Sequence, residues 1–115
     1  MERRRSRRKS VSLPARIESP EAAYEGIIEN VSEHGLCMET DSQHLLKASM
    51  RFQPGAEYEV RFHTPSGNEI RLRCKVTWSY KVAPQGLKKK IGMEIVFPPP
   101  SFVQFYRQLG EKKSS

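Results

Sequence analysis

Six of the first ten side chains are basic, and only Glu2 opposes them. The basic residues are Arg3, Arg4, Arg5, Arg7, Arg8 and Lys9. A guanidinium group presents a planar fork of donors that matches phosphate oxygens, and it also matches the O6 and N7 edge of guanine. The segment therefore favours an anionic ligand rich in guanine over a bare polyphosphate. From composition alone, a disordered basic tail that binds polyanions weakly is the simpler interpretation.

A second group of polar residues lies further along the chain, in the stretch ENVSEHGL. Asn30, Ser32 and Gly35 fall at an expected corner between two strands. Amide and hydroxyl groups in such a corner can bind a ligand or the local backbone, and glycine permits a close approach. Taken alone, this stretch is better explained as an ordinary turn.

The sequence gives no indication of catalysis. The three histidines, His34, His44 and His63, are scattered, and there is no Walker loop, GxGxxG motif or nucleophile elbow. Cys37 and Cys74 lie in apolar stretches without CxxC spacing, which predicts two buried free thiols in a reducing cytoplasm. We therefore expect no enzyme activity, catalytic residue, metal site or cofactor.

The charge of the chain is concentrated at one end. Its 115 residues carry a net charge of +7, and the first ten contribute six basic residues against one acidic residue. The rest is nearly balanced, which favours a local anionic partner over a surface that coats DNA. No apolar run approaches the roughly 18 residues of a membrane span, and no apolar segment follows the basic start. We expect a cytoplasmic protein with no membrane partner and no signal peptide.

Alternating apolar and polar residues predict a single all-β domain. The expected strands span 11–19, 23–32, 35–40, 57–63, 70–80 and 88–97. This pattern favours an antiparallel barrel or sandwich, at residues 11–110, between a flexible arm at 1–10 and a disordered tail at 111–115. A C-terminal helix at 101–110 would cover one open end, with Ser101 in a capping box and Phe102, Phe105, Tyr106 and Leu109 on its apolar face.

Several local features carry their own predictions. Pro14 cannot donate to a ladder, so its strand should pair on one side only there. The strand at 70–80 alternates throughout, which places Trp78 on the buried face, and Phe97 shares the buried face of the last strand. Asp41 is expected to cap a short helical turn. The stretch 87–90 is expected to form a solvated hairpin tip.

Together, the two polar groups resemble the motifs of the PilZ domain family, RxxxR followed by [D/N]xSxxG. The first motif corresponds to Arg4–Arg8 and the second to Asn30–Gly35. The segments LPARI, PGAEYEVRF, KVTW and KIGMEIVF also fall where that family has similar segments. The resemblance runs from Glu2 to about Leu109.

The resemblance implies a six-stranded antiparallel β-barrel with a C-terminal helix that binds cyclic di-GMP, a bacterial second messenger. In that family the arginines of the arm close over the ligand, and the corner motif contacts guanine and ribose. The implied ligand-binding residues are Arg4, Arg8, Asn30, Ser32 and Gly35. The register of Arg3 with Arg7 also fits RxxxR, but the other register gives the family's usual distance from Arg8 to Leu13.

The chain departs from the family pattern in two places. Asn30 replaces the commoner Asp, which can change the guanine contacts in detail. Lys9 and Ser10 stand where the family often has an aliphatic residue and a proline, which implies a more mobile arm and leaves the number of bound ligands open. Additional ligand contacts are expected from Arg3, Arg5, Arg7, Trp78 and Gly92.

Two other functions stay open at this point. The first is a PilZ-shaped module that binds a protein and no nucleotide, although such members usually lack these arginines. The second is a small nucleic-acid-binding barrel in which the arm grips phosphates and aromatic side chains stack on bases. We favour a cyclic di-GMP sensor that acts through a partner protein over both, and we expect no nucleic-acid partner.

Overall fold

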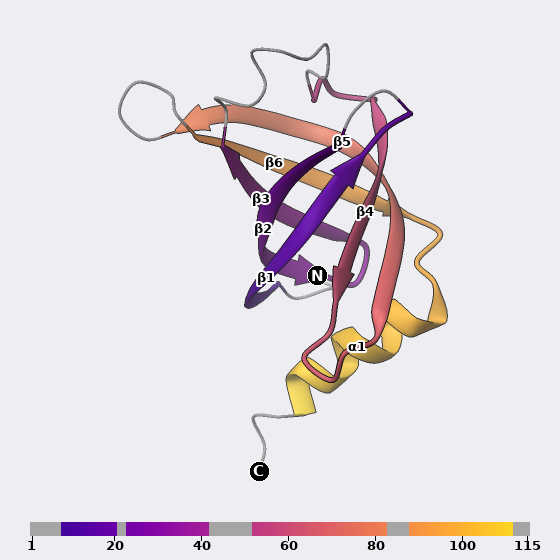
Figure 1. Ribbon diagram of the computed structural model, residues 1–115. Coiled ribbons are helices and arrows are strands. Elements are labelled where there is room, and N and C mark those ends of the chain that lie inside the picture. The colour runs from indigo at the N-terminus through magenta and orange to yellow at the C-terminus, as the bar shows by residue number, and fades with distance from the viewer. Residues whose placement is uncertain (1–7, 21–22, 42–51, 83–87, 112–115) are drawn as a thin grey trace, which may run out of the picture.

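The computed structural model describes residues 8–20, 23–41, 52–82 and 88–111. These ranges contain six strands and one helix: β1 (Lys9–Glu18), β2 (Ala23–Ser32), β3 (Gly35–Asp41), β4 (Glu57–His63), β5 (Glu69–Val82), β6 (Lys88–Val96) and α1 (Pro100–Glu111). The strands pair antiparallel into a closed barrel in the order β1-β2-β3-β6-β5-β4, and α1 lies at one end of it (Figure 1). The predicted six-stranded antiparallel barrel with a C-terminal helix is confirmed.

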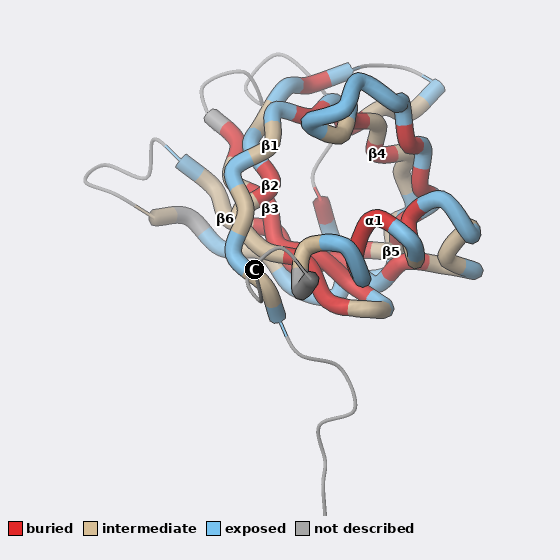
Figure 2. The backbone as a smooth tube through the Cα atoms, turned by 90° about the horizontal axis from the view of Figure 1, so that it is seen from below, coloured by how far each residue is buried: buried red, intermediate tan, exposed pale blue. Residues whose placement is uncertain are grey.

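The interior of the barrel is filled by the apolar residues of the alternating strands. Ile17, Val60 and Leu72 are examples, and each is essentially inaccessible to solvent. Viewed from below, the buried positions recur around the ring, as the period of two requires (Figure 2). The long strands therefore share one core, and their alternate residues are left for the outer surface.

Helix α1 contributes its apolar face to the same core. Phe102, Phe105 and Tyr106 are buried, and the ring of Phe105 lies 5.5 Å from that of Phe62 on β4. The predicted apolar face is therefore confirmed. The helix begins at Pro100, with the carbonyl of Pro99 accepting from two backbone N–H groups of the first turn.

The predicted capping box at the helix start is wrong. Ser101 lies within the first turn, after Pro100, and is not the residue that caps it. Proline suits the first helical position because its fixed φ is helical and its missing N–H would have no partner there.

Strand β1 begins at Lys9, two residues before the predicted start at Val11. The Lys9 ammonium donates to the Tyr106 carbonyl at 2.9 Å and lies 3.9 Å from the centre of the Tyr106 ring. The expectation that Lys9 and Ser10 belong to a mobile arm is therefore wrong, because both residues are part of the barrel. Strand β1 is thereby joined to α1.

Pro14 behaves as its chemistry predicts. It pairs with Ile27 of β2, whereas the pairing between β1 and β4 extends only from Ala15 to Glu18. The side of β1 that faces β4 thus needs no donor at Pro14, and the prediction of one-sided pairing is confirmed.

A bulge in β5 overturns the predicted position of Trp78. The register between β5 and β6 shifts between Val76 and Trp78, and the hydroxyl of the intervening Thr77 donates to the Gly92 carbonyl at 3.0 Å. One extra residue moves all later side chains to the opposite face. Trp78 and Tyr80 consequently point outward, with 38% and 54% of their surfaces exposed.

Phe97 also lies on the surface, contrary to the prediction. Strand β6 ends at Val96, and Phe97 is 90% exposed with a positive φ of 52°. The three residues that follow it are prolines, which cannot donate to a ladder, so the strand stops before Phe97 can be turned inward.

Three smaller predictions concern the hairpin tip, the cysteines and the membrane. Lys88–Lys90 belong to β6 and not to a hairpin tip, while Leu87, the helical turn after Asp41 and residues 112–115 lie outside the described ranges. Cys37 and Cys74 are buried free thiols, as predicted. In the part of the chain that the structure covers, no helix has the length and apolar character needed to span a bilayer.

Candidate ligand-binding site

The structure joins the ends of the two sequence motifs. Arg8 Nη1 donates to Asn30 Oδ1 at 2.6 Å, although the two residues are 22 positions apart in the chain. This contact follows from the pairing of β1 with β2, in which Ser10 lies opposite Asn30. The last arginine of the basic segment is thus held beside the first residue of the corner motif.

Asn30 begins a row of residues that crosses the outer face of the barrel. Asn30 pairs with Cys37 on β3, Cys37 with Gly92 on β6, and Gly92 with Trp78 on β5. Directly paired residues on antiparallel strands point to the same face. Neighbouring strands are about 4.8 Å apart, so the row extends roughly 14 Å from β2 to β5. We call Asn30, Cys37, Gly92 and Trp78 the outer row.

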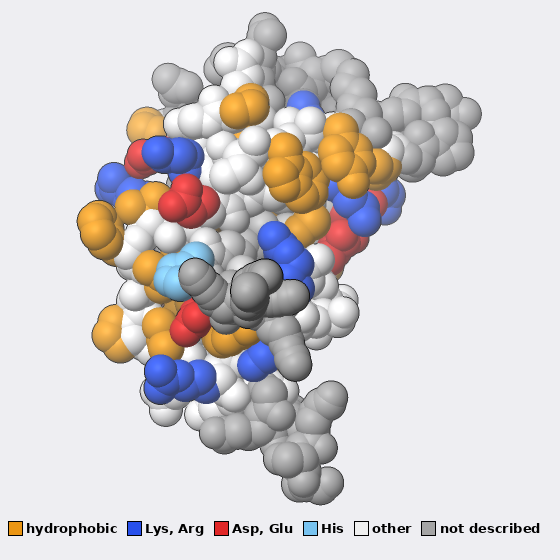
Figure 3. Space-filling view, turned by 180° about the vertical axis from the view of Figure 1, so that it is seen from behind, with side chains coloured by type: hydrophobic (Ala, Val, Ile, Leu, Met, Phe, Trp, Pro, Cys, Tyr) orange, Lys and Arg blue, Asp and Glu red, His pale blue; other side chains and the backbone are white. Residues whose placement is uncertain are grey.

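The far end of the outer row is an aromatic surface. The Trp78 indole lies directly over Gly92, and a Cβ added to Gly92 would be 2.2 Å from Trp78 Cε2. Tyr80 stacks on Trp78, with ring centres 5.3 Å apart and an angle of 17° between the planes. Figure 3 shows the side of the molecule opposite to Figure 1, where hydrophobic side chains lie beside basic and acidic ones. Such exposed flat rings can stack on a nucleobase.

Gly92→Ala is expected to displace the indole ring, because no side chain fits beneath it at this position. Trp78 is the single tryptophan of the chain, so its fluorescence emission reports this change alone. We expect a shift of the emission maximum to longer wavelength as the ring becomes more exposed to water. Glu94→Ala, at an exposed position of the same strand, is the control, and equal spectra for the two variants would refute this packing.

The corner motif is tightly packed between β2, β3 and β6. The Ser32 hydroxyl is buried and donates to the Gly35 carbonyl at 3.4 Å, while the Ile95 N–H donates to the His34 carbonyl at 2.8 Å. A Cβ on Gly35 would lie 2.8 Å from the Met93 carbonyl oxygen. Position 35 therefore requires glycine, because the backbone of β6 lies too close for a Cβ atom. The Ser32 hydrogen bond to Gly35 stabilises the conformation of the corner.

Charged groups surround the middle of the outer row. Lys90 on β6 pairs with Glu29, the residue before Asn30, with 3.1 Å between Nζ and Oε1. Burial raises the pKa of the Cys37 thiol and the charge of Glu29 raises it further, while Lys90 and Arg8 oppose this effect. The hydrogen bond to Glu29 and the charge of that carboxylate raise the pKa of Lys90, which keeps it cationic.

The sequence-predicted site residues divide into three groups. Ser32 and Gly35 pack in the corner between β2, β3 and β6. Arg8, Asn30, Gly92 and Trp78 come together as described. The other arginines of the basic segment, Arg3, Arg4, Arg5 and Arg7, lie outside the described residues.

Sequence reasoning missed three members of the site: Cys37, Glu29 and Lys90. Cys37 was detectable, because Leu36 and Met38 on either side of it follow the inward period and leave Cys37 facing out. Glu29 and Lys90 were not, since their contact depends on a bulge in β2 between Ile28 and Asn30.

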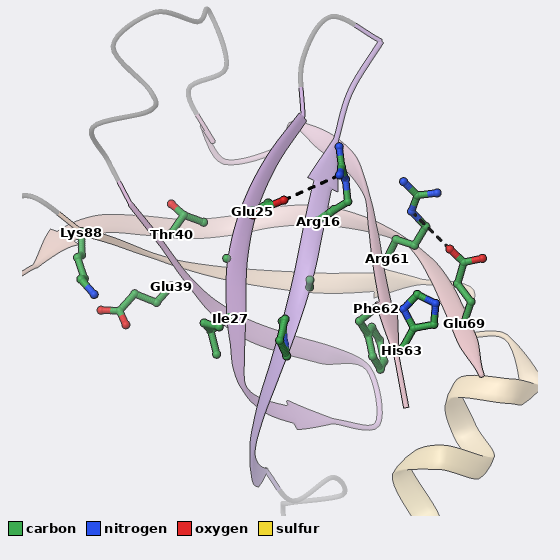
Figure 4. Close-up of a pocket in the computed structure, with 13 residues that line it drawn as sticks. Arg16, Glu25, Ile27, Glu39, Thr40, Arg61, Phe62, His63, Glu69 and Lys88 are labelled. Carbon is green, nitrogen blue, oxygen red and sulfur yellow. Dashed lines mark ion pairs between the residues drawn. The ribbon is translucent and has the colours of Figure 1, made fainter. Parts of the chain in front are cut away.

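A different surface, on the outer side of β1–β4, forms a groove of about 620 Å³ (Figure 4). Its charged side chains pair with one another, as Arg16 does with Glu25 at 3.9 Å and Arg61 with Glu69 at 3.6 Å. The exposed Ile27 lies in this groove. Its two arginines each contact a carboxylate, so their charge is partly neutralised within the groove, and Lys88 lines it as well.

Within residues 8–20, 23–41, 52–82 and 88–111, no three metal-ligating side chains are grouped to hold an ion. At one end of the outer row lie the Asn30 amide and the Arg8 guanidinium, and at the other lie exposed aromatic rings, so these groups can hydrogen-bond to a ligand or stack on it.

Comparison with known structures shows the same fold. The Bacillus subtilis inhibitor of motility (MotI/DgrA) matches with a TM-score of 0.75 and 18% identity, over 100% of this chain and 55% of that one. The PilZ domain of YcgR from Escherichia coli with c-di-GMP matches with a TM-score of 0.65 and 11% identity, over 99% of each chain. The K. pneumonia MrkH–c-di-GMP complex matches with a TM-score of 0.71 and 15% identity, over 100% of this chain and 57% of that one.

This chain therefore spans just over half of the MotI/DgrA and MrkH chains. At these identities the likeness establishes the fold alone. No curated protein sequence matches the chain. The model of the PilZ domain, however, matches residues 2–109, which is nearly the full length and includes both sequence motifs. The chain belongs to the PilZ domain family.

Proposed function

We propose that this protein is a receptor for cyclic di-GMP, and that the RxxxR segment and the corner motif hold the nucleotide between them. The observation that carries the proposal is the contact of 2.6 Å between Arg8 and Asn30. It joins the two motifs at one end of the outer row. Arg4 and Arg8 are the proposed clamp, and Asn30, Ser32 and Gly35 form the proposed guanine seat.

The chemistry of the outer row suits this ligand. Cyclic di-GMP carries two phosphates and two guanines, so it needs cations and flat surfaces close together. Arg8 supplies a fork for phosphate or for the guanine O6 and N7 edge, and Trp78 supplies an exposed ring at the other end. The structures of YcgR and MrkH with c-di-GMP, which share this fold, support the assignment.

The proposed mechanism is an ordering of the arm. Fixing one backbone residue costs about 1–2 kcal/mol, and each charge-assisted hydrogen bond returns about 1.5–3 kcal/mol. Several arginines must therefore bind together for closure to be favourable. Lys9 is already held in β1 and against Tyr106, and Arg8 already contacts Asn30, so the proposed ordering concerns the part of the arm before Arg8.

The proposed output is a change of surface. The arm, closed over the ligand, presents a new face to a partner protein in the cytoplasm, and that partner carries the response. In this proposal the protein is a receptor and adaptor with no catalytic step of its own, and cyclic di-GMP is its ligand and not a cofactor.

Isothermal calorimetry with cyclic di-GMP tests the proposal, with GTP and cyclic di-AMP as controls. We expect saturable binding of cyclic di-GMP and little heat with either control. Cyclic di-AMP lacks the guanine that the fork and the seat read, and GTP offers one guanine where cyclic di-GMP offers two guanines held by two bridging phosphates. A nucleic-acid-binding barrel would instead bind random oligonucleotides, with affinity that falls steeply as salt rises. Absence of binding to cyclic di-GMP would refute the proposed function.

A further inference from the structure

An ion pair borders the outer row beside Cys37. Lys90 on β6 and Glu29 on β2 reach across β3, with Lys90 Nζ 3.1 Å from Glu29 Oε1. Their side chains are 33% and 28% exposed, so the pair is accessible from the outer face. Lys90 is also two residues before Gly92, whose surface Trp78 covers.

Lys90 and Arg8 lie on either side of Cys37 in the outer row. The charges of Lys90 and Arg8 both act on the Cys37 thiol, which lies on β3 between β2 and β6. Arg8 reaches this point from the β2 side through Asn30, and Lys90 reaches it from the β6 side. Lys90 therefore adds a cation on the β6 side of the row, opposite to the side from which Arg8 approaches.

A ligand phosphate can replace the Glu29 carboxylate as the partner of Lys90. A partly exposed pair of this kind contributes little net stability, because solvent screens it. A phosphate accepts stronger hydrogen bonds from an ammonium than water does, and it can replace the carboxylate as partner. Until that exchange occurs, the charge of Glu29 opposes the approach of an anion.

We propose that Lys90 is a further phosphate-binding residue of this site, and that Glu29 holds it in place and lowers the affinity for the ligand. This inference rests on the proposed function, since it names a further residue for the same dinucleotide. It places a cation on the β6 side of the row, where neither sequence motif supplies one.

Calorimetry of the full chain with cyclic di-GMP tests the assignment through Lys90→Met and Glu29→Gln. We expect Lys90→Met to weaken binding about 10-fold, as the loss of one charge-assisted contact implies. Glu29→Gln should strengthen binding a few-fold, because one of the two carboxylates beside Lys90 is removed, while Glu39, which pairs with Lys90 across β3 and β6, remains. Lys88→Met is the matched control, since Lys88 is an exposed lysine on the same strand and should leave affinity unchanged.

The salt dependence of binding separates a ligand contact from a structural role. Between ~0.1 M and ~1 M salt, the affinity of Lys90→Met should fall less than that of the wild type, because one screened attraction is absent. Lys90→Arg, which keeps the charge, should retain most of the binding even if Lys90→Met folds poorly. Equal affinity and salt dependence for Lys90→Met and Lys88→Met would overturn this assignment alone. Absence of binding by the wild type would overturn the proposed function as well.

Discussion

Arg8→Ala is expected to weaken cyclic di-GMP binding by about 100-fold or more. A guanidinium fork makes two charge-assisted hydrogen bonds, each worth about 1.5–3 kcal/mol, and every 1.4 kcal/mol is about tenfold in affinity. The substitution also removes the contact with Asn30 that joins the two motifs. Calorimetry with the purified variant measures the loss.

Arg71→Ala is the control for this prediction. Arg71 is an exposed arginine of strand β5 that pairs with Glu69, away from the outer row, so its loss should leave binding unchanged. Arg4→Ala, in the other half of the RxxxR motif, should weaken binding nearly as much as Arg8→Ala. Unchanged affinity in both motif variants would contradict the clamp.

Phe102→Ala is expected to destabilise the protein by about 3–5 kcal/mol, which corresponds to a decrease in Tm of about 10–20 °C. Phe102 is fully buried between α1 and the barrel, so its removal leaves a cavity at the end that the helix closes. Since domains of this size are stable by only about 5–15 kcal/mol, this loss is a large fraction of the total. Thermal and denaturant unfolding followed by circular dichroism measure it.

Gln104→Ala is the matched variant for Phe102→Ala, because Gln104 lies on the exposed face of the same helix. Its effect should stay within about 0.5 kcal/mol, as is usual for surface positions. If the two variants unfold at the same temperature, the helix does not close the core in the way described here.

The strands and the helix could be predicted from the sequence because they depend on a local rule, whereas the choice of a closed barrel over a sandwich came from the family resemblance. A period of two assigns each strand an inner and an outer face. Gly55 and Gly67 mark turns between strands, because both adopt a positive φ that glycine accommodates easily. The apolar face of α1 follows in the same way from a period of 3.6 residues.

Individual side chains escaped prediction where a bulge interrupts the period. Nothing in the sequence marks Thr77 as an extra residue, yet it alone moves Trp78 from the core to the surface. Its hydrogen bond to the Gly92 carbonyl exists only once β5 and β6 are paired. The one feature that makes Trp78 available to a ligand therefore depends on tertiary structure.

Contacts between residues far apart in the chain could not be predicted from the sequence either. Lys9 and Tyr106 are 97 positions apart, and their contact depends on the placement of α1 at the end of the barrel. The meeting of Arg8 and Asn30 was expected only from the family resemblance, because residue types do not determine strand register. Asn30, by contrast, stood out in the sequence as a polar residue at a corner.

Titration of the ¹⁵N-labelled full chain with cyclic di-GMP, followed by NMR, tests the central claim most directly. The account predicts large shifts for the Trp78 indole N–H and for the amides of Asn30, Gly35 and Gly92, with few changes in α1 beyond Tyr106. The same titration of Arg8→Ala should leave those signals in place. Signals of the outer row that do not move when the wild-type chain is saturated with the nucleotide would contradict the account.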